Sequence, residues 1–207
     1  NDPRFKEQNF QTIEIQPTFD YKKEIWLHHT NNTLQAFKNV LSKLNNEEAA
    51  PLPICVFINS TDIIYSLMKQ LDLLEESAVF CAPKSVDKLK KNRFCNVYEQ
   101  WNKDKMKRYN FFTSRFFNAV DMELEEQPHV IMLTDVYFAE HTMIDPYTDA
   151  IQIVGRFRNG VSSITYISNT KKGLPQRSKE EIKGYLICSK EIYRTMKNFY
   201  DCATDRA

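Results

Sequence analysis

Two closely spaced arginines are the residues of this chain best suited to chemistry. They lie in the stretch Gln152-Ile153-Val154-Gly155-Arg156-Phe157-Arg158. A guanidinium is always charged and presents a rigid fork of donors that fits the oxygens of a phosphate. Such a group can stabilise the negative charge that spreads over the γ-phosphate oxygens during phosphoryl transfer. The ordinary alternative is that Arg156 and Arg158 are surface residues that pair with carboxylates.

The spacing of the two arginines leaves open which of them would touch a phosphate. Residues two apart on a helix point about 200° from each other, so both reach one phosphate cluster only if the helix ends there. Asn159-Gly160 is typical of a helix end. Asp145-Pro146 is typical of a helix start, with a capping carboxylate and then proline at the first helical position. We therefore expect a helix over 145–160 that carries the arginines near its end.

Short apolar runs alternate with helical patterns before and after this stretch. A continuous run such as 54–58 is typical of a strand covered on both faces, and apolar residues spaced three and four apart indicate helices. The expected strands lie at 54–58, 78–81, 95–98, 109–113, 130–133 and 164–167. The expected helices lie at 32–44, 63–71, 83–91 and 145–160. Strand, polar turn and helix in repetition predict a three-layer α/β fold with a central, mostly parallel sheet.

The two ends of the chain carry separate patterns. Loose alternation at 12–16 and 25–27 predicts one or two short strands or an extended arm. Ser178-x-x-Glu181 is a capping box that opens a long amphipathic helix, whose apolar face either packs back on the domain or leads into a further domain. The chain begins without methionine and ends inside a charged helical pattern, which indicates a piece of a longer protein. We expect an arm and leading helix at 1–50, a core at 51–170 and a helical extension at 171–207.

The composition narrows the class of protein. A formal net charge of +1 means that any nucleic-acid surface would have to be local. The five cysteines are odd in number and none shows the close spacing of a zinc site, so we expect reduced, mostly buried thiols and no metal site. No stretch approaches the roughly 18 apolar residues of a membrane span, and no signal peptide is visible. We therefore expect a cytoplasmic protein with no membrane partner.

The stretch Gln152-x-x-Gly155-Arg156-x-Arg158 resembles the last conserved motif of superfamily 2 helicases and translocases. Earlier stretches stand in the order of that family. Val56-Phe57-Ile58-Asn59-Ser60 resembles the strand and turn that open its second RecA-like domain. The run from Phe111 through Thr113-Ser114 to Asp121 resembles its Thr-Ser and Gly-x-Asp motif, and 130–135 is the strand that separates this motif from the last one. Over roughly 54–168 the chain is similar to the C-terminal RecA-like domain of a DEAD/DEAH-like helicase.

This resemblance implies roles for particular residues. Those at a nucleotide would be Arg156 and Arg158 as catalytic arginines, with Gln152, Gly155 and Asp121. Those on the sugar–phosphate backbone of DNA or RNA would be Ser60, Thr113 and Ser114. The cofactors would be ATP and Mg²⁺, bound mainly by an N-terminal RecA-like domain of the same polypeptide. The chain would then be one half of a motor whose two domains close on a nucleotide.

The chain also departs from this family. The family more often places its two arginines three residues apart, and Ala119 stands where the family usually has glycine. The sequence has no Gly-x-x-x-x-Gly-Lys-Ser/Thr phosphate loop and no Asp-Glu pair of the acidic metal motif. Without them the chain has no primary ATP site. Alone, it is expected not to hydrolyse ATP.

Two other functions stay open. One is a degenerate RecA-like scaffold or binding module without ATPase activity. The other is a flavodoxin- or receiver-like domain, which predicts an acidic pocket or a phosphate-binding loop after the first strand; Asn59-Ser60-Thr61 offers neither. Single residues have ordinary alternatives as well. Asp121 could be a helix cap, and Ser60 and Thr113-Ser114 could be simple caps at strand–helix turns.

Overall fold

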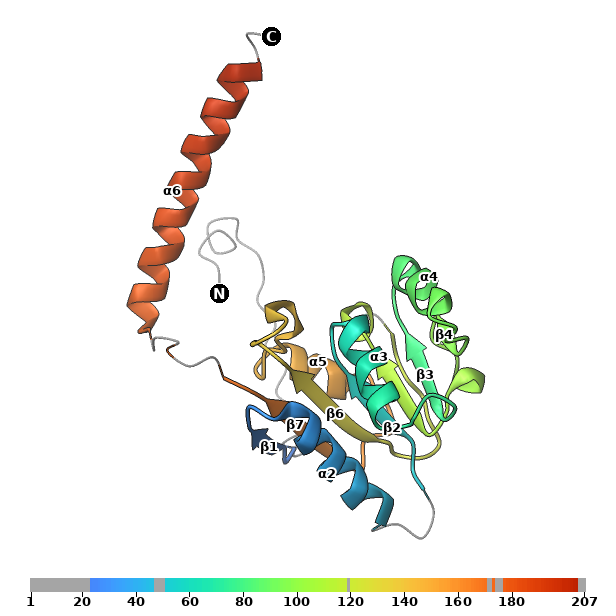
Figure 1. Cartoon of the computed structure of the whole chain (residues 1–207). Helices are drawn as coiled ribbons and strands as arrows, with labels where there is room; N and C mark the ends of the chain where they lie inside the picture. Colours follow the sequence, from blue (N-terminus) through green and yellow to red (C-terminus); the bar gives the residue numbers. More distant parts are fainter. Residues whose placement is uncertain (1–22, 47–50, 119, 171–172, 174–176, 205–207) are drawn as a thin grey trace, which may run out of the picture. The chain divides into compact units, whose positions relative to one another are not determined.

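The computed structural model describes residues 23–46, 51–118, 120–170, 173 and 177–204. The strand expected at 12–16 and the departure at Ala119 lie outside the described residues. The chain divides into two compact units, Asn1–Asn169 and Thr170–Ala207. The first is an α/β domain on one seven-stranded sheet in which every strand pairing is parallel (Figure 1). This is the expected three-layer fold of the RecA-like class, and it is followed by the expected C-terminal helix.

The elements alternate along the chain as the patterns predict. The strands are β1 Trp26–His29, β2 Ile54–Phe57, β3 Ser77–Phe80, β4 Val97–Tyr98, β5 Tyr109–Phe112, β6 His129–Thr134 and β7 Ser163–Ser168. The helices are α2 Thr33–Asn46, α3 Thr61–Gln70, α4 Pro83–Lys91, α5 Asp149–Gly155 and α6 Lys179–Thr204. The short 3₁₀ turns are η1 Lys103–Lys105, η2 Ser114–Phe116 and η3 Glu140–Thr142. The strand order across the sheet is β1-β7-β6-β2-β5-β3-β4.

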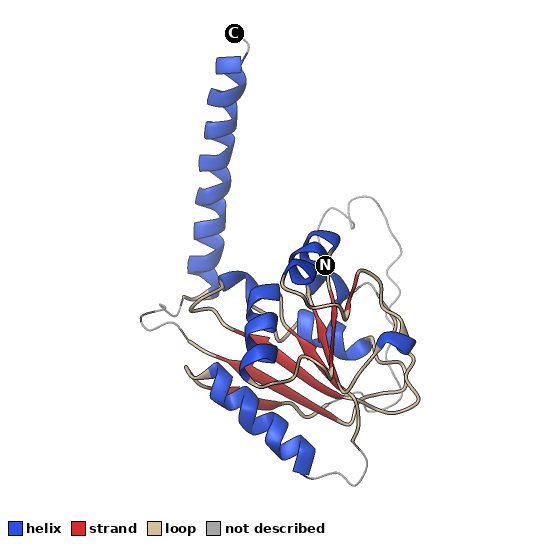
Figure 2. Cartoon of the chain, turned by 45° about the vertical axis from the view of Figure 1, so that its right-hand side comes forward, coloured by secondary structure: helices blue, strands red, loops and turns tan. Residues whose placement is uncertain are grey.

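Alternate side chains of the central strands build two separate cores. In β2, Ile54 and Val56 join the core formed with α2, α3 and α4, whereas Cys55 and Phe57 join the core formed with η2 and α5. All four residues are fully buried. Successive side chains of a strand point to opposite faces, so a strand covered on both faces needs a continuous apolar run. Figure 2 shows the strands with helices on either side.

A row of stacked phenylalanines fixes the second face of the sheet. The ring of Phe112 on β5 stacks on Phe57 of β2 at 5.0 Å and on Phe80 of β3 at 4.9 Å between centroids. Phe116 of η2 meets Phe80 and Phe112 edge-on, at 6.2 and 5.9 Å. Aromatic pairs commonly adopt stacked and edge-on contacts of this kind. They anchor the turn that begins with Thr113, directly after β5.

The sheet has a switch point at its centre. β2 pairs with β5 on one side and with β6 on the other. The chain leaves β2 toward β3, and it leaves the neighbouring β6 in the opposite direction, toward β7. In open parallel sheets, ligands bind beyond the carboxyl ends of the strands where the strand order reverses. The strands β2, β5 and β6 end at Phe57, Phe112 and Thr134, and the segments that follow them leave the sheet at its carboxyl edge. The residues expected to contact ligands after β2 and β5 therefore share one side of the domain.

The helix expected over 145–160 is shorter at both ends. The carboxylate of Asp145 accepts hydrogen bonds from the amides of Tyr147 and Thr148, at 2.7 and 3.0 Å, and so forms a turn ahead of the helix. α5 therefore starts at Asp149. It ends at Gly155, before both arginines. Backbone groups beyond Gly155 form tertiary hydrogen bonds, described below, in place of helical ones. The prediction that Asn159-Gly160 ends this helix is wrong, and Gly160 instead lies in a following turn with φ of 87°.

Two smaller expectations are corrected. The strand expected at 95–98 covers only Val97–Tyr98, so Cys95 is exposed. All five cysteines are free, but only Cys55 and Cys81 are buried, so the expectation of mostly buried thiols is wrong. Burial raises the pKa of the Cys81 thiol to about 12, with a further contribution from the charge of Glu99. Among the described residues, no helix is long and apolar enough to cross a membrane.

Substitution Phe112→Ala is expected to lower the free energy of unfolding by about 3–5 kcal/mol, because it opens a cavity between two stacked rings. Urea unfolding followed by far-ultraviolet circular dichroism measures the change. Phe138→Ala is the matched control: this side chain is 83% exposed, and we expect a change within about 0.5 kcal/mol. Equal losses in the two variants would contradict this description of the core.

Candidate functional site

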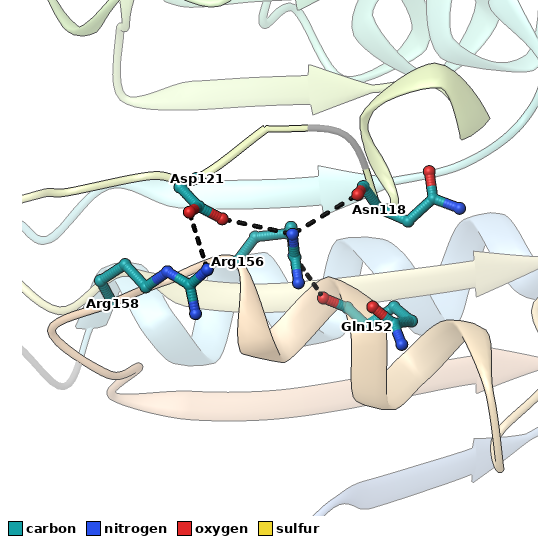
Figure 3. Close-up of polar contacts among 5 residues, drawn as sticks. All are labelled: Asn118, Asp121, Gln152, Arg156 and Arg158. Atoms are coloured by element: carbon teal, nitrogen blue, oxygen red, sulfur yellow. Dashed lines mark hydrogen bonds and ion pairs between the residues drawn. The ribbon is translucent and has the colours of Figure 1, made fainter. Parts of the chain in front are cut away.

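Asp121, in the segment between η2 and β6, pairs with both arginines (Figure 3). Its Oδ1 lies 3.2 Å from Nη1 of Arg156, and its Oδ2 lies 2.7 Å from Nη2 of Arg158. Each oxygen of one carboxylate thus accepts from a different guanidinium. The structure therefore brings together three of the residues expected at a nucleotide, from two separate stretches of sequence.

A backbone pairing explains why both arginines reach the same carboxylate. The amide of Met122 donates to the carbonyl of Arg156 at 2.7 Å, and the amide of Arg158 donates to the carbonyl of Met122 at 3.2 Å. Met122 and Phe157 are thereby bridged in parallel. Phe157 is buried edge-on against Phe57, at 6.1 Å between ring centroids, while both flanking arginines turn to the carboxylate (Figure 3). The divergence expected of helical neighbours does not apply, because the helix has already ended.

The two arginines are held differently. Besides the carboxylate of Asp121, the guanidinium of Arg156 donates to the carbonyls of Gln152 and Asn118, at 3.2 and 3.4 Å, and the side chain is 19% exposed. Arg158 is 49% exposed, and its described hydrogen bond goes to Asp121 alone. Arg156 is therefore fixed by three acceptors of its own domain, whereas Arg158 keeps donors directed at solvent.

The arginines lower the pKa of the Asp121 carboxyl. The hydrogen bond from Arg158 is the largest cause; the charges of Arg158 and Arg156 act in the same direction, and partial desolvation opposes them. The carboxylate therefore stays ionised at neutral pH and has no tendency to take up a proton there. Asp121 is suited to placing cations, and a general-base role is disfavoured.

Gln152 and Gly155 lie on the exposed side of α5. The carbonyl of Gln152 accepts the Nε–H of Arg156, so its backbone already contributes to the arginine cluster. A Cβ added at Gly155 would meet no atom within 4 Å, and this glycine is not in the left-handed region. Nothing in the described part of the chain therefore requires glycine at this position.

A second group of expected residues gathers at the carboxyl edge of the sheet. Ser60, Thr113 and Ser114 line one open depression of about 280 Å³, together with Asn59, Thr61, Asp62, Ala82, Ser85, Arg115 and His141. The Oγ of Ser60 accepts the amide of Ile63 at 3.4 Å and caps α3, as its ordinary alternative predicts. The depression therefore lies at the amino end of α3, where free amides and the helix dipole favour an anion.

Asn59 ties the walls of this depression together. Its side-chain oxygen accepts the amide of Ser114 at 3.3 Å, and its side-chain nitrogen donates to the carbonyl of His141 at 2.9 Å. The ends of β2 and β5 and the turn η3 are thus joined through one amide. Asn59 is a positioning residue for Ser114.

Several contributors were not expected from the sequence. Asn118 and Met122 act through backbone groups, which leave no side-chain signal. Arg115 and His141 reach the depression only because η2 and η3 are placed beside α3. Asn59 had a detectable signal, since it is a polar residue directly after a buried strand.

The described residues include no group of three or more His, Cys, Asp or Glu side chains that could hold a metal ion. Comparison with known proteins finds no family model and no curated protein that matches this chain.

Arg158→Gln is expected to raise the pKa of Asp121 toward its ordinary value of 3.8, and by more than Arg156→Gln does. The reason is that the Arg158 hydrogen bond is the largest cause of the lowered pKa. In the wild type, this ion pair stabilises the fold fully above the ordinary pKa, and the contribution is lost as pH falls through the lowered one. Carboxyl ¹³C chemical shifts followed through an acid titration measure the pKa. A larger shift in Arg156→Gln would contradict the assignment.

Proposed function

We propose that this chain is the second, C-terminal motor domain of an ATP-dependent nucleic-acid helicase or translocase. The observation that carries the proposal is the meeting of Arg156 and Arg158 at Asp121, because a helicase-like order of motifs needs its last two motifs to meet in space. The gathering of Ser60 and Thr113-Ser114 in one depression supports it. The proposal includes a cytoplasmic location.

The chemistry assigned to this domain is charge stabilisation. In the proposal, ATP and Mg²⁺ are bound mainly by an N-terminal RecA-like domain of the same polypeptide, which supplies the phosphate loop. The present domain contributes a guanidinium to the γ-phosphate when the two domains close. An arginine supplied from a neighbouring element in this way accelerates phosphoryl transfer by about 10³–10⁵-fold. Hydrolysis is then possible only in the closed arrangement, which links it to domain movement.

We assign the phosphate contact to Arg158 and the positioning role to Arg156. Arg158 is half-exposed and needs to exchange only its bond to Asp121 for a phosphate oxygen. Arg156 would have to give up two backbone carbonyls as well. Both bonds lie at the exposed surface, so losing them would cost about 0.5–1.5 kcal/mol each. The more weakly held arginine is therefore the better arginine finger.

The depression at the carboxyl edge is assigned to the sugar–phosphate backbone of a nucleic-acid strand. Ser60, Ser114 and the amino end of α3 offer hydroxyls and amides, and Arg115 adds a positive charge. The Asp62 carboxylate in the same lining is paired with Lys88. These groups recognise phosphate without reading bases. Binding here and hydrolysis at the arginines would use two separate parts of one domain.

A scaffold without ATPase activity is the second candidate. One observation favours it. Arg156 and Asp121 form an ion pair within the domain, so they have a structural role without any nucleotide. The two candidates differ in whether Arg158 affects turnover.

In the protein that joins this domain to its ATP-binding domain, Arg158→Ala is expected to lower strand-stimulated ATPase turnover by about 10³-fold or more. The ATP dissociation constant should stay within about an order of magnitude, because the first domain supplies most of the ATP contacts. Steady-state ATPase assays and equilibrium binding of a fluorescent ATP analogue measure the two effects. Arg156→Lys keeps one charge near Asp121 and should lose less activity than Arg158→Lys. Wild-type turnover in Arg158→Ala would favour the scaffold.

Arg115→Gln is expected to weaken binding of a single-stranded oligonucleotide to a similar degree for different sequences, because Arg115 would contact phosphate only. The slope of log affinity against log salt should fall by about 1. Fluorescence anisotropy over a salt series measures both. Lys69→Gln is the control, since Lys69 is an exposed cation in the last turn of α3, at the opposite end from the depression. Equal effects of the two substitutions would remove the depression as the binding site.

A further inference from the structure

The helix α6 presents a long apolar surface that the structure leaves exposed. It runs for 26 residues as one uninterrupted helix (Figure 1). The expected capping box opens it: the amide of Ser178 donates to the carboxylate of Glu181 at 2.6 Å, and the amide of Glu181 donates to the Ser178 hydroxyl at 3.2 Å. The large apolar side chains of α6 are 47–73% exposed. They are Ile182, Tyr185, Leu186, Ile187, Ile192, Tyr193, Met196, Phe199 and Tyr200.

Apart from Ile187, these side chains follow a seven-residue repeat. With Ile182 at position a of a heptad, positions a and d hold Ile182, Tyr185, Ser189, Ile192, Met196, Phe199 and Ala203. Positions e and g hold Leu186, Cys188, Tyr193, Thr195, Tyr200 and Cys202. Every charged side chain from Ile182 to Thr204 stands at b, c or f: Lys183, Lys190, Glu191, Arg194, Lys197 and Asp201. We call the uncharged a, d, e and g face the α6 seam.

Such a division of charged and uncharged positions is the pattern of a helix that packs against another helix. A repeat of 3.5 residues keeps one seam facing a partner along the whole length. Helices in proteins owe most of their stability to packing of an apolar face, and an exposed face of this extent marks an interaction surface. The pattern therefore fits a helical partner better than a flat sheet or a nucleic acid.

We propose that the α6 seam pairs with the same seam of a second copy of this chain, in antiparallel orientation. In this arrangement each a position faces a d position of the other copy. Ser189 meets Phe199, Met196 meets Ile192, and Ala203 meets Tyr185. The layers made by Ser189 and Ala203 each combine a small side chain with a large aromatic one, which is how facing positions fill space at native density. The proposal is independent of the motor function.

The parallel arrangement fits less well. It would place Ser189 against Ser189 and Ala203 against Ala203, and Phe199 against Phe199. Small layers would then leave cavities while large layers would be overfilled, and both faults destabilise a core. In the antiparallel pair, flanking e positions also match, with Leu186 against Tyr200 and Tyr193 against its own copy. A two-fold interface requires self-complementarity of this kind, which points to a second copy of this chain as the partner of the α6 seam.

Sedimentation analysis of the whole chain over a range of concentrations tests the pairing. Wild type should form a dimer, and Ile192→Lys should raise the dimer dissociation constant by at least about a hundredfold, because it buries an unpaired charge in the seam. Ile187→Lys is the matched control: Ile187 stands at position f, is 63% exposed, and should leave the dimer unchanged. Unchanged circular dichroism of the α/β core verifies folding in both variants. A wild-type monomer at every concentration, or a dimer unaffected by Ile192→Lys, would overturn the proposal.

The orientation is tested with a short thiol-reactive bifunctional cross-linker in a Cys95→Ser background, which removes the exposed cysteine outside α6. The antiparallel pair places Cys188 of one copy beside Cys202 of the other. Cross-linked dimer should therefore form with both cysteines present and disappear in either Cys188→Ser or Cys202→Ser. Cross-linking that persists in each single-cysteine variant would show like residues facing each other, and would overturn the antiparallel arrangement.

Discussion

The pairing of Met122 with the arginine segment is the contact on which the rest of this site depends. Two backbone hydrogen bonds, from Met122 to Arg156 and from Arg158 back to Met122, join the segment after η2 to the segment after α5. They take up backbone groups that a longer helix would use internally, so α5 stops at Gly155. Because backbone groups form the contact, it sets the positions of the neighbouring side chains regardless of their charges.

Most of the fold follows from the order of apolar runs and helical spacings. The runs containing β2, β5 and β6 are continuous because both faces of these strands are covered, so their positions were predictable. The end of α5 differs from the prediction because a distant contact decides it. Nothing near Gly155 in the sequence signals that Met122 will end the helix. The proline and aspartate before α5 favour a helix start, yet the Asp145 carboxylate forms a local turn first, because aspartate competes with the helix for nearby amides.

The candidate site was predictable only in its side chains. Asp121, Arg156 and Arg158 were expected to act together, and the structure places them within hydrogen-bonding distance. Their unequal surroundings could not be predicted, because the carbonyl of Asn118 reaches Arg156 only through the fold. The same holds for Asn59, whose amide joins η2 and η3. Sequence patterns identify which groups are present, whereas the number of hydrogen-bond partners of each group depends on the tertiary structure.

Phe57 connects the two parts of the site through the core. Its ring contacts those of Phe112, Phe117 and Phe157. In the sequence, Phe112 comes directly before Thr113 of the depression, Phe117 comes shortly before Asp121, and Phe157 lies between the two arginines. A close-packed interior of this kind transmits displacement rather than absorbing it. The arginine cluster and the depression are therefore both attached to the same packed core. If this domain works in a motor, we infer that coupling between hydrolysis and strand movement comes from motion of the whole domain against its partner. A rearrangement between the two parts of the site would require the phenylalanine core to repack.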